Sequence, residues 1–597
     1  MWLTRGQGSL EERFFSRRLR MIGAVFMFLF SALAVRLFAL QIIQGERLAT
    51  VSERNRLQLI FLRAPRGRIL DANGDPLMDN GASFTLFFSP APGSSPEEAD
   101  RVERALLKYK ELSADVVRRR LNEALRIRQF VRIAEDLPRA AAFGLIEDSR
   151  GLPGVTVSPE SRRAYARGYP ASHVIGYLSE ATRKELGGAS PEVLRMGDFV
   201  GRQGIEQAYD RTLRGRNGGM EIEVDSTGRQ IRLVRSVEPV PGNDVRLTVD
   251  PRVQRAAEEA LAASSTGRGA VVVLNPATGA VTALASAPSF DASGGLQGAF
   301  RDRRLPLFNR AAQGTYPLGS CFKIVTTGVA LRKGLVRPST HFNCAGTHRL
   351  GTRFFGCWKT HGRMDLYGGI AWSCDVYFYQ MARLLDPEDL ATGAHEFGLG
   401  RATGIDLPGE AAGLVPGPGW KTRAGRGAWY KGDTLNLAIG QGQLLVTPLQ
   451  AAVMMSVVAN RGRFYRPFLV REIRDRRGEV LWRNRPREGG RVELDPEHWE
   501  IMEEALRRVV TEGTGQGMRI EGWDIIGKTG TAQNPHGEDH AWFVCALRRP
   551  GEGRARLCMA VLVENGGHGG AVAVPVARRV AMAALEEGTD EPDSHGF

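Results

Sequence analysis

Residues 316–323 read YPLGSCFK and contain the chain's single Ser-x-x-Lys motif, formed by Ser320 and Lys323. The Tyr-Pro-Leu-Gly turn is expected to start a helix at Ser320. Positions i and i+3 share one helix face, so the Lys323 amine can reach the Ser320 hydroxyl. A buried lysine loses its charge readily and can then activate a serine. An isolated motif of this kind is more often a solvated lysine one turn from a serine, so the interpretation depends on further motifs.

A second motif, Lys528-Thr529-Gly530-Thr531, follows residues 525–527 (IIG) and predicts a β-strand. A strand of small residues lets an extended peptide lie beside it as an added strand. Thr529 can bind a substrate carboxylate there, and Lys528 supplies positive potential. The alternative is an ordinary edge strand with a solvated lysine, because the tetrapeptide alone is only moderately specific.

Between these motifs lies Ser373-Cys374-Asp375, which supplies a Ser-x-Asp sequence. The pattern is common, and residues 113–115 and 289–291 also match it, but neither lies between the other two motifs. The order Ser-x-x-Lys, Ser-x-Asn/Asp, Lys-Thr-Gly resembles that of β-lactamases and penicillin-binding proteins.

Further segments resemble class B penicillin-binding proteins over nearly the whole chain. They are residues 66–71, 73–74, 201–206 and 213–215 for the N-terminal module, and 403–406, 440–442, 447–448 and 541–543 for the transpeptidase domain. Asp375, where most relatives have Asn, and the N-terminal anchor make the chain resemble the elongation-type members. The resemblance implies an α+β fold. A transpeptidase domain with an antiparallel sheet flanked by helices would follow an elongated pedestal and one transmembrane helix.

An N-terminal apolar segment predicts the membrane anchor. Residues 21–43 contain one charge, Arg36, and about 23 residues at 1.5 Å each span a hydrocarbon core of ~30 Å. Four arginines precede the segment, so residues 1–20 should stay cytoplasmic and the rest should be exported. A cleaved signal peptide is the alternative, because residues 32–34 (ALA) resemble a cleavage site, although the apolar run continues past them. We expect a single-pass inner-membrane protein with a periplasmic catalytic domain.

The exported part is expected to divide near residues 241–244. Residues 44–243 should form the pedestal, a dimerisation-like domain, with a helix over residues 97–128. Residues 244–587 should form the transpeptidase domain, and residues 588–597 an acidic, disordered tail. Within the transpeptidase domain the pattern predicts strands at 245–249, 541–547 and 557–563, a hairpin over 269–285, and helices over 251–263 and 574–586.

The basic composition does not indicate nucleic-acid binding. The 597 residues carry a net charge of +14, but only nine of the 80 basic residues are lysines, and the arginines are spread along the chain. A nucleic-acid protein would be expected to cluster its basic residues. The charge instead fits an anchored body beside an anionic membrane and cell wall. Hydrophobic residues make up 43% and charged residues 24%, which excludes a disordered or collagen-like chain.

The family resemblance implies a catalytic mechanism. Ser320 would attack the penultimate D-alanine carbonyl of a stem pentapeptide, and an amine of a neighbouring stem peptide would resolve the acyl-enzyme into a cross-link. Lys323 would be the general base, and Ser373 and Lys528 would pass a proton to the leaving amine. The role of Asp375 stays open, because a carboxylate cannot donate a hydrogen bond as Asn does. β-Lactams would acylate Ser320 as mimics of the D-alanyl-D-alanine end.

The same resemblance implies how substrate is held. The backbone N–H groups of Ser320 and Thr531 would form an oxyanion hole. The hydroxyls of Thr529 and Thr531, on either side of Gly530, would bind the terminal carboxylate.

Three of the six cysteines fall in one segment with a histidine. Cys344, Cys357, His361 and Cys374 make a Cys₃His set, the composition of closed structural zinc sites, and some elongation-type relatives carry a ligand set here. A disulfide between Cys344 and Cys357 is one alternative, because the compartment is oxidising, and buried free thiols are another. Zinc is the one cofactor expected. The remaining cysteines, expected at core or helix positions, are Cys321, Cys545 and Cys558.

The implied partners are those of wall elongation: peptidoglycan stem pentapeptides, the membrane, a RodA-type glycosyltransferase, an MreC-type scaffold and β-lactam antibiotics, with no nucleic acid. A division-type class B transpeptidase shares all of the chemistry and differs mainly in its partners. A non-enzymatic scaffold is the rival of another kind, and the presence of every motif residue argues against it. A β-lactam sensor would be expected to have several membrane spans before the penicillin-binding domain.

Overall fold

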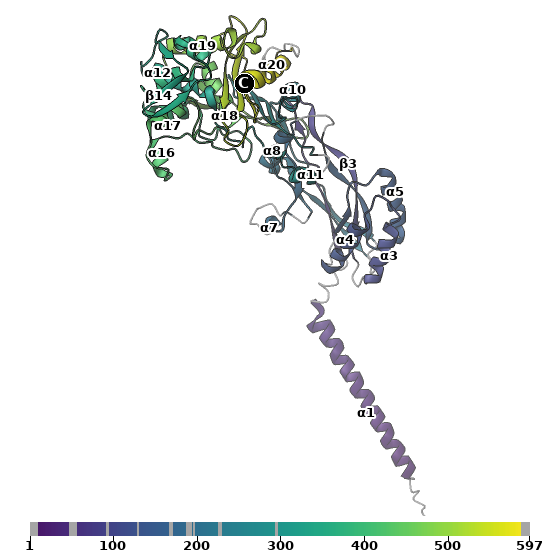
Figure 1. The fold of residues 1–597 in the computed structure, drawn as a ribbon. Helices are drawn as coiled ribbons and strands as arrows, with labels where there is room; N and C mark the ends of the chain where they lie inside the picture. The colour runs from purple at the N-terminus through teal and green to yellow at the C-terminus, as the bar shows by residue number, and fades with distance from the viewer. Residues whose placement is uncertain are drawn as a thin grey trace, which may run out of the picture. The chain divides into compact units, whose positions relative to one another are not determined.

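The computed structural model describes residues 10–46, 57–90, 95–127, 131–165, 171–186, 194, 197–224, 230–292 and 296–586. The chain splits into two compact units (Figure 1). The first comprises Met1–Ala64, Ala82–Glu160 and Arg216–Val240, and the second comprises Pro65–Gly81, Ser161–Gly215 and Pro241–Phe597. The acidic tail over residues 588–597 lies outside the described residues.

The N-terminal helix is long and apolar enough to cross a membrane. Helix α1 spans Leu10–Phe38 and continues into a π-helical turn at Ala39–Ile43. The candidate span is Arg17–Ile43, with a mean hydropathy of 2.2, and none of it is buried in the protein. Exposed apolar side chains on a helix whose backbone groups are satisfied internally suit contact with lipid.

The rest of the first unit combines short helices and strands. A three-stranded sheet has the order β1 (Leu57–Leu62), β8 (Gly218–Val224) and β9 (Gln230–Val237). The helix expected over residues 97–128 is instead two helices, α3 (Pro96–Leu106) and α4 (Ala114–Ile127). The chain turns at Tyr109–Leu112 and a new helix starts at Ser113, whose carbonyl accepts from the N–H groups of Val116 and Val117. The further elements are α5 (Arg139–Asp148), β4 (Val131–Ala134) and parts of β3 (Pro76–Phe88) and β5 (Val155–Tyr165).

The second unit is built on a five-stranded antiparallel sheet. Its order is β12 (Val281–Ala287), β11 (Gly269–Leu274), β23 (Leu557–Val563), β22 (His540–Arg548) and β21 (Asp524–Ala532). The predicted hairpin is confirmed, because β11 pairs with β12 in antiparallel register. The predicted pairing of the two C-terminal strands is also confirmed, from Ala541 opposite Val563 to Leu547 opposite Leu557.

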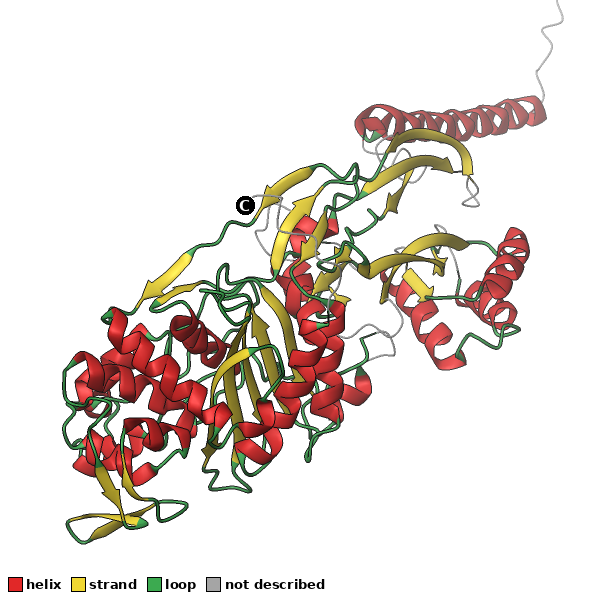
Figure 2. Ribbon diagram, turned by 90° about the horizontal axis from the view of Figure 1, so that it is seen from above, coloured by secondary structure: helices red, strands yellow, loops and turns green. Residues whose placement is uncertain are grey.

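Helices cover both faces of this sheet (Figure 2). On one face Val271 and Val273 pack with α10 (Pro251–Ala262) and α20 (Gly569–Leu585). On the other face Ala270 and Val272 pack with α12 (Lys323–Arg332) and α18 (Pro448–Ala459). Successive strand side chains point to opposite faces, so one apolar strand supplies both cores. The predicted fold class, an α+β domain with an antiparallel sheet flanked by helices, is confirmed.

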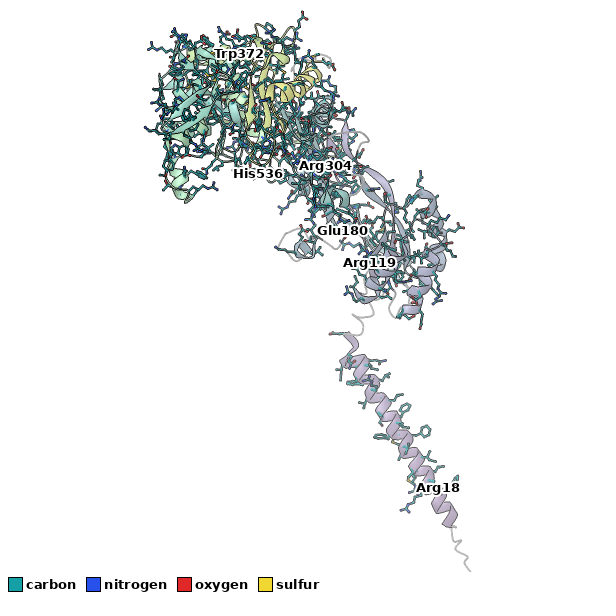
Figure 3. The ribbon with its side chains drawn as sticks, viewed as in Figure 1. Arg18, Arg119, Glu180, Arg304, Trp372 and His536 are labelled. Atoms are coloured by element: carbon teal, nitrogen blue, oxygen red, sulfur yellow. The ribbon has the colours of Figure 1, made fainter. Side chains whose placement is uncertain are left out.

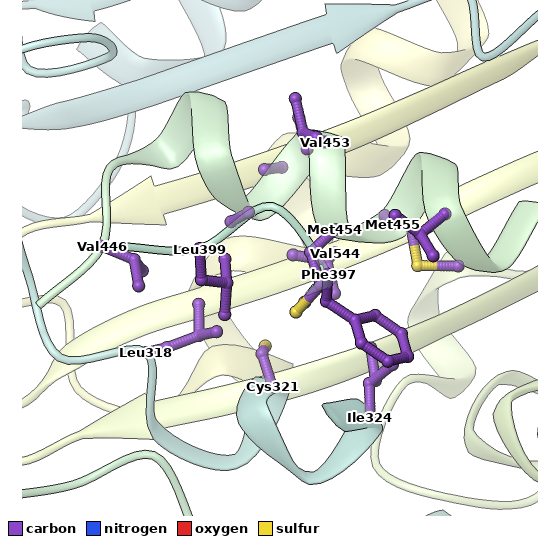
Figure 4. Close-up of a cluster of buried hydrophobic side chains, with 14 of the residues drawn as sticks. Leu318, Cys321, Ile324, Phe397, Leu399, Val446, Val453, Met454, Met455 and Val544 are labelled. Atoms are coloured by element: carbon purple, nitrogen blue, oxygen red, sulfur yellow. The ribbon is translucent and has the colours of Figure 1, made fainter. Parts of the chain in front are cut away.

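Helix α18 forms the centre of the second core. All twelve of its residues are buried, and it begins with a capping box in which Thr447 and Gln450 exchange side-chain and backbone hydrogen bonds. Its side chains Val453, Met454 and Met455 lie with Leu318 and Cys321 in one apolar cluster (Figure 4). The turn that carries Ser320 therefore rests on a close-packed apolar base.

A smaller lobe of short elements completes this side of the unit. Its helices are α13 (Leu366–Ala371), α14 (Asp375–Ala382), α15 (Pro387–Glu396), α16 (Pro418–Arg423), α17 (Lys431–Ala438) and α19 (Pro496–Thr511). Two hairpin-like pairs lie beside them: β13 (Phe342–Cys344) with β16 (Gly362–Met364), and β14 (Thr347–Leu350) with β15 (Arg353–Gly356).

The segments that resemble the family's N-terminal module form a buried ionic network in the second unit. Arg66 donates to Glu206 at 2.7 Å, and Arg163 donates to the other oxygen of Glu206 at 2.8 Å. Arg68 forms an ion pair with Asp244, the first residue of β10 (Asp244–Leu247), at 2.6 Å. Between the two arginines, a Cβ on Gly67 would lie 1.8 Å from the Asn243 carbonyl oxygen, so only glycine fits. These contacts explain the Arg-Gly-Arg spacing.

The unit's remaining short elements are β2 (Ile69–Leu70), α6 (Ser172–Ile175), β6 (Leu178–Glu180), α7 (Arg183–Leu186), β7 (Phe199–Gly201), α8 (Gly204–Ala208), α9 (Asp210–Arg214), α11 (Gln297–Arg301), β17 (Arg463–Tyr465), β18 (Val470–Arg474), β19 (Val480–Arg483) and β20 (Glu488–Arg491).

Candidate active site

The Ser320 turn is held against the end of strand β21. Ser320 lies in a short 3-10 helix, Gly319–Phe322, which leads directly into α12. Gly319 has φ of 57°, and a Cβ there would lie 2.5 Å from the Thr531 carbonyl oxygen. The Gly319 N–H donates to the Gly440 carbonyl at 2.9 Å. Glycine therefore lets the backbone before Ser320 approach the backbone of Thr531 directly.

Lys323 points from α12 toward the central motif. Its side chain is fully buried, and Nζ donates to Asp375 Oδ1 at 2.7 Å, to the Ser373 carbonyl at 2.9 Å and to Ser373 Oγ at 3.2 Å. The Phe378 ring centroid lies 5.1 Å from the amine. The contact expected between Lys323 and Ser320 is not among the hydrogen bonds of the described residues. Ser373 and Asp375 take the amine's donors instead.

Lys528 approaches the same hydroxyl from β21. Its Nζ donates to Ser373 Oγ at 2.9 Å and to the Thr529 carbonyl at 2.9 Å, and the side chain is fully buried. Burial lowers the pKa of Lys528 to about 7, and the positive charge of Lys323 lowers it further in the same direction. Ser373 Oγ thus joins two lysines, one of which can gain or lose a proton near neutral pH.

Ser373 adopts a backbone conformation that non-glycine residues rarely take. Its φ is 54°, in the left-handed region, and its N–H donates to the Ile370 carbonyl at 3.1 Å. The next residue, Cys374, donates its N–H to the Gly369 carbonyl at 2.9 Å and begins α14 as its N-cap. Such strain persists only where the surroundings over-determine it, and it commonly marks a functional residue.

Strand β21 carries the threonines of the third motif. It is the last strand of its sheet and pairs with β22, where Thr529 lies opposite Phe543. Thr529 Oγ1 lies 2.5 Å from Thr514 Oγ1, and Thr531 Oγ1 accepts from the Gly569 N–H at 3.4 Å. At Gly530, a Cβ would lie 2.9 Å from the Cys321 sulfur. The edge position suits a strand that accepts a peptide alongside it.

One contributor was not predicted as a site residue. The Gln441 side-chain amide donates to the Thr531 carbonyl at 3.1 Å, and its oxygen accepts from the Gln533 N–H at 3.2 Å. Gln441 therefore fixes the backbone of β21 where the oxyanion hole is expected. In the sequence it was visible only as part of a family-like Gly-Gln-Gly segment, with no chemical signal of its own.

The predicted Cys₃His residues come together in space. Donor atoms of Cys344, Cys357, His361 and Cys374 all lie within 4.8 Å of one another. His361 Nδ1 is 3.7 Å from the Cys344 sulfur and 3.5 Å from the Cys357 sulfur. The sulfurs of Cys357 and Cys374 are 4.0 Å apart, and this contact lowers the pKa of Cys357 to about 4 while raising that of Cys374. All six cysteines have free thiols.

These separations fit a tetrahedral zinc ion. With Zn–S of about 2.3 Å and Zn–N of about 2.1 Å, tetrahedral angles place the donor atoms roughly 3.6–3.8 Å apart. The three measured contacts lie close to that range. The other nitrogen of His361, Nε2, is buried without a hydrogen-bond partner among the described residues. The Cys₃His residues therefore have both the chemistry and the spacing of a structural zinc site.

The lobe that holds these four residues also contacts the catalytic loop. Trp358, one residue after Cys357, donates its indole N–H to the Trp372 carbonyl at 3.1 Å. Trp372 directly precedes Ser373 and is partly exposed at the surface (Figure 3). The last two predicted core cysteines, Cys545 and Cys558, are fully buried in β22 and β23.

Comparisons with known proteins agree with this geometry. The penicillin binding protein transpeptidase domain matches residues 269–582, and the penicillin-binding protein dimerisation domain matches residues 61–247. A peptidoglycan D,D-transpeptidase, MrdA, of Acinetobacter baumannii is 33% identical over 94% of this chain and 87% of its own. MrdA of Escherichia coli K12 is 30% identical over 94% of this chain and 93% of its own.

Solved structures give the same result. The chain is similar to penicillin-binding protein 2 in its complex with MreC from Helicobacter pylori, with a TM-score of 0.77 and 25% identity over 88% of this chain and 99% of that one. It also resembles a chain of a peptidoglycan synthase complex that coordinates polymerisation and crosslinking, with a TM-score of 0.70 and 32% identity over 96% of this chain and 99% of that one. These relatives do not favour the division-type enzyme or the non-enzymatic scaffold. The chain belongs to the elongation-type class B penicillin-binding proteins, the penicillin-binding protein 2 group of peptidoglycan D,D-transpeptidases.

Proposed function

We propose that Ser320 is the nucleophile of the transpeptidase reaction and that Lys323, Ser373 and Lys528 carry its protons. The observation that supports this assignment is the single hydroxyl, Ser373 Oγ, in hydrogen-bond contact with two fully buried lysines beside the Ser320 turn. Buried amines with an adjacent hydroxyl can exchange protons without bulk water, which is what acylation of a serine requires.

In the first half-reaction the Ser320 hydroxyl attacks the penultimate D-alanine carbonyl of a stem pentapeptide. Lys323 takes the hydroxyl proton as the Oγ–C bond forms. When the C–N bond breaks, Ser373 and Lys528 deliver a proton to the departing D-alanine amine. In the second half-reaction an amine of another stem peptide attacks the ester, Ser320 regains its proton, and the new amide is the cross-link.

Two backbone N–H groups, of Ser320 and Thr531, stabilise the oxyanion in both half-reactions. Each such donor is commonly worth about 3 kcal/mol. The close packing of Gly319 against Thr531 and the clamp by Gln441 keep the two donors in register. The hydroxyls of Thr529 and Thr531 bind the substrate's terminal carboxylate. β-Lactams enter the same cycle at acylation and remain as stable esters.

Asp375 acts as an orienting residue. Its carboxylate accepts from Lys323 at 2.7 Å, opposite the bond from Lys323 to Ser373 Oγ. An Asn oxygen could accept the same hydrogen bond, so the departure from the usual family residue leaves this function intact. The carboxylate adds an ion pair to it.

We propose further that Cys344, Cys357, His361 and Cys374 bind a structural zinc ion. When bound, zinc would cross-link the β13–β16 and β14–β15 hairpins to the start of α14. Cys374 lies between Ser373 and Asp375, so this cross-link supports the loop that contacts both lysines. The donor distances and the Cys₃His composition support the assignment.

The cellular setting is proposed from the anchor and the relatives. Arginines before the apolar span place the N-terminus in the cytoplasm and the catalytic unit in the periplasm of a cell with an inner membrane. Partners of the expected kinds are a RodA-type glycosyltransferase and an MreC-type scaffold, because similar chains are solved with MreC and within a peptidoglycan synthase complex. This protein would then contribute to wall elongation and cell shape.

Labelling of the detergent-solubilised full chain with a fluorescent penicillin tests the nucleophile. The native chain is expected to form a covalent adduct, and Ser320→Ala is expected to form none. Ser264→Ala, which removes a hydroxyl bonded to the Leu261 carbonyl at the end of α10, is the matched control and should label normally. Labelling that persists in Ser320→Ala would refute the assignment.

A further inference from the structure

A buried carboxylate lies behind the Ser320 turn, and no step of the reaction above uses it. Glu564 directly follows β23, and its side chain is 9% exposed. Oε1 accepts from the Tyr316 hydroxyl at 2.6 Å and from Arg310 Nε at 3.0 Å. Arg268 Nη2 lies 3.0 Å from Oε2. The carboxylate is thus compensated by two guanidinium groups and one phenol.

Arg310 is committed to this cluster. Its side chain is 1% exposed, and its two terminal nitrogens donate to the Leu305 and Arg304 carbonyls at 3.1 and 2.8 Å. A guanidinium with all of its donors engaged inside the protein has little freedom to follow Glu564 if that residue moves. Arg310 therefore holds the carboxylate at a fixed point.

Tyr316 connects that fixed point to the nucleophile. It is the first residue of the segment that ends at Ser320, and its backbone N–H and carbonyl both bond to Val446 at 2.9 Å. A Cβ on Gly314 would lie 2.5 Å from the Tyr316 hydroxyl, so the phenol is enclosed. The next residue, Pro317, has its carbonyl bonded to the Trp542 indole N–H at 3.0 Å.

The other end of the cluster connects to the strand that carries the oxyanion hole. Asn565, which follows Glu564, has φ of 53°, and its side-chain oxygen accepts from Asn534 at 2.9 Å. Asn534 lies two residues beyond the end of β21. The His540 ring nitrogen Nδ1 accepts from the Asn565 N–H at 3.1 Å. Residues 564–565 thus contact both the Ser320 turn and the segment after Thr531.

We propose that Glu564, Arg310 and Tyr316 are positioning residues that set the Ser320 hydroxyl relative to the backbone N–H of Thr531 during acylation. The proposal rests on Ser320 being the nucleophile, as argued above. None of the three residues touches the groups assigned to substrate binding, so the cluster acts through the turn. A displacement well below 1 Å between nucleophile and oxyanion donors lowers the rate of attack, while the terminal carboxylate can still bind at Thr529 and Thr531.

Acylation kinetics separate binding from attack. Time-resolved reaction of the full chain with a fluorescent penicillin gives a dissociation constant for the initial complex and a first-order acylation constant. Tyr316→Phe keeps the ring that packs edge-on against His540 and Trp542 but removes the hydroxyl. We expect its acylation constant to fall on the order of tenfold, with the dissociation constant unchanged within about twofold.

A conservative change at Glu564 provides the rescue test. Glu564→Gln keeps an oxygen that can accept from Tyr316 and should retain acylation within about threefold of the native chain. Glu564→Ala leaves Arg310 buried without its acceptor and should lose at least as much as Tyr316→Phe. If Glu564→Ala does not fold, Tyr316→Phe and Glu564→Gln decide the question alone.

Tyr209→Phe is the matched control. Its hydroxyl also donates to a buried carboxylate, Asp406, at 3.3 Å, and that carboxylate accepts from the backbone at Leu469 and Val470 rather than from the Ser320 turn. This variant should acylate as the native chain does, while its melting temperature falls about as much as that of Tyr316→Phe.

Three results would overturn the proposal: native acylation in Tyr316→Phe, an equal loss in Tyr209→Phe, or a loss confined to the dissociation constant. Failure of the underlying assignment has a different signature, because labelling would then survive in Ser320→Ala.

Discussion

Two clusters meet at residues 373–375, and they are built on opposite principles. In the lysine cluster, each buried amine finds acceptors on the chain itself: Lys323 bonds to Asp375 and Ser373, and Lys528 bonds to Ser373. In the Cys₃His cluster, four donor atoms of the same Lewis-basic character converge within 4.8 Å. Buried polar groups are normally satisfied by complementary partners. The first cluster is complete as a proton-transfer network, and the second has the composition that suits a cation.

The difference teaches how one loop serves two purposes. Ser373 points to the lysines, and Cys374 points to the sulfur cluster and caps α14. The positive φ of Ser373 turns the chain sharply enough for adjacent side chains to face different clusters. We expect changes in the lysine cluster to abolish chemistry, and changes in the Cys₃His cluster to weaken it through this loop.

The largest effect is expected from the lysine cluster. Lys323→Ala removes the proposed base and should lower the acylation constant for a fluorescent penicillin by roughly 10³-fold, within the range of general base catalysis. The control is Lys333→Ala, ten residues along, which breaks only a surface ion pair with Asp389. An effect below tenfold in Lys323→Ala would move the base role to another group and break the contrast between the clusters.

A second effect concerns pH and stability. The pKa of Lys528 is about 7 in the folded protein, below its usual 10.5, so the unfolded chain binds a proton that the folded chain lacks between these values. Stability therefore rises with pH across that window, and below pH 7 the full cost of burying the charge is present. Lys528→Met should melt about 5 °C higher than the native chain at pH 6, and this gain should shrink toward pH 10.

Thermal melting of the full chain at both pH values measures this effect. Lys333→Met, at an exposed position, should show no such pH dependence. A gain that is equal at pH 6 and pH 10 would show that Lys528 is not buried as an uncompensated amine.

The smallest effect is expected from the Cys₃His cluster. Metal analysis of the purified chain should give one zinc per molecule, and Cys357→Ser should lower that content. Acylation should then fall by about tenfold, because loss of the cross-link loosens the loop around Ser373. Cys558→Ala, a core change outside the cluster, should keep its zinc. A native chain without stoichiometric zinc would contradict the metal assignment.

Local sequence predicted most of the elements around the site. Period-2 apolar patterns predicted β11, β12, β22 and β23, and a Pro after an Asp cap predicted α10. The pattern was less reliable where no proline or glycine marks a boundary. The break between α3 and α4 lies in a charged segment whose spacing is compatible with one continuous helix, so only packing of Leu112 and Tyr109 reveals it.

The site residues were predicted from motif order and family resemblance, but not their contacts. Spacing on a helix favours a bond between Ser320 and Lys323, yet Lys323 bonds to residues some fifty positions away. Gln441 and Glu564 carry no motif of chemical character, since a single Gln or Glu has many uses. Their roles follow only from what they touch.

The sequence by itself determined which chemical groups are available: a Ser-x-x-Lys turn, a Lys-Thr-Gly strand, a central Ser-x-Asp, four metal-type donors and one apolar span. These are local patterns, in which residue type and short spacing are sufficient. Tertiary structure decided which groups are partners. Antiparallel pairing brings β21 beside the Ser320 turn, and packing on α18 fixes that turn in place. Proton transfer and metal binding depend on distances of a few ångströms between residues far apart in the chain, and folding alone sets those distances.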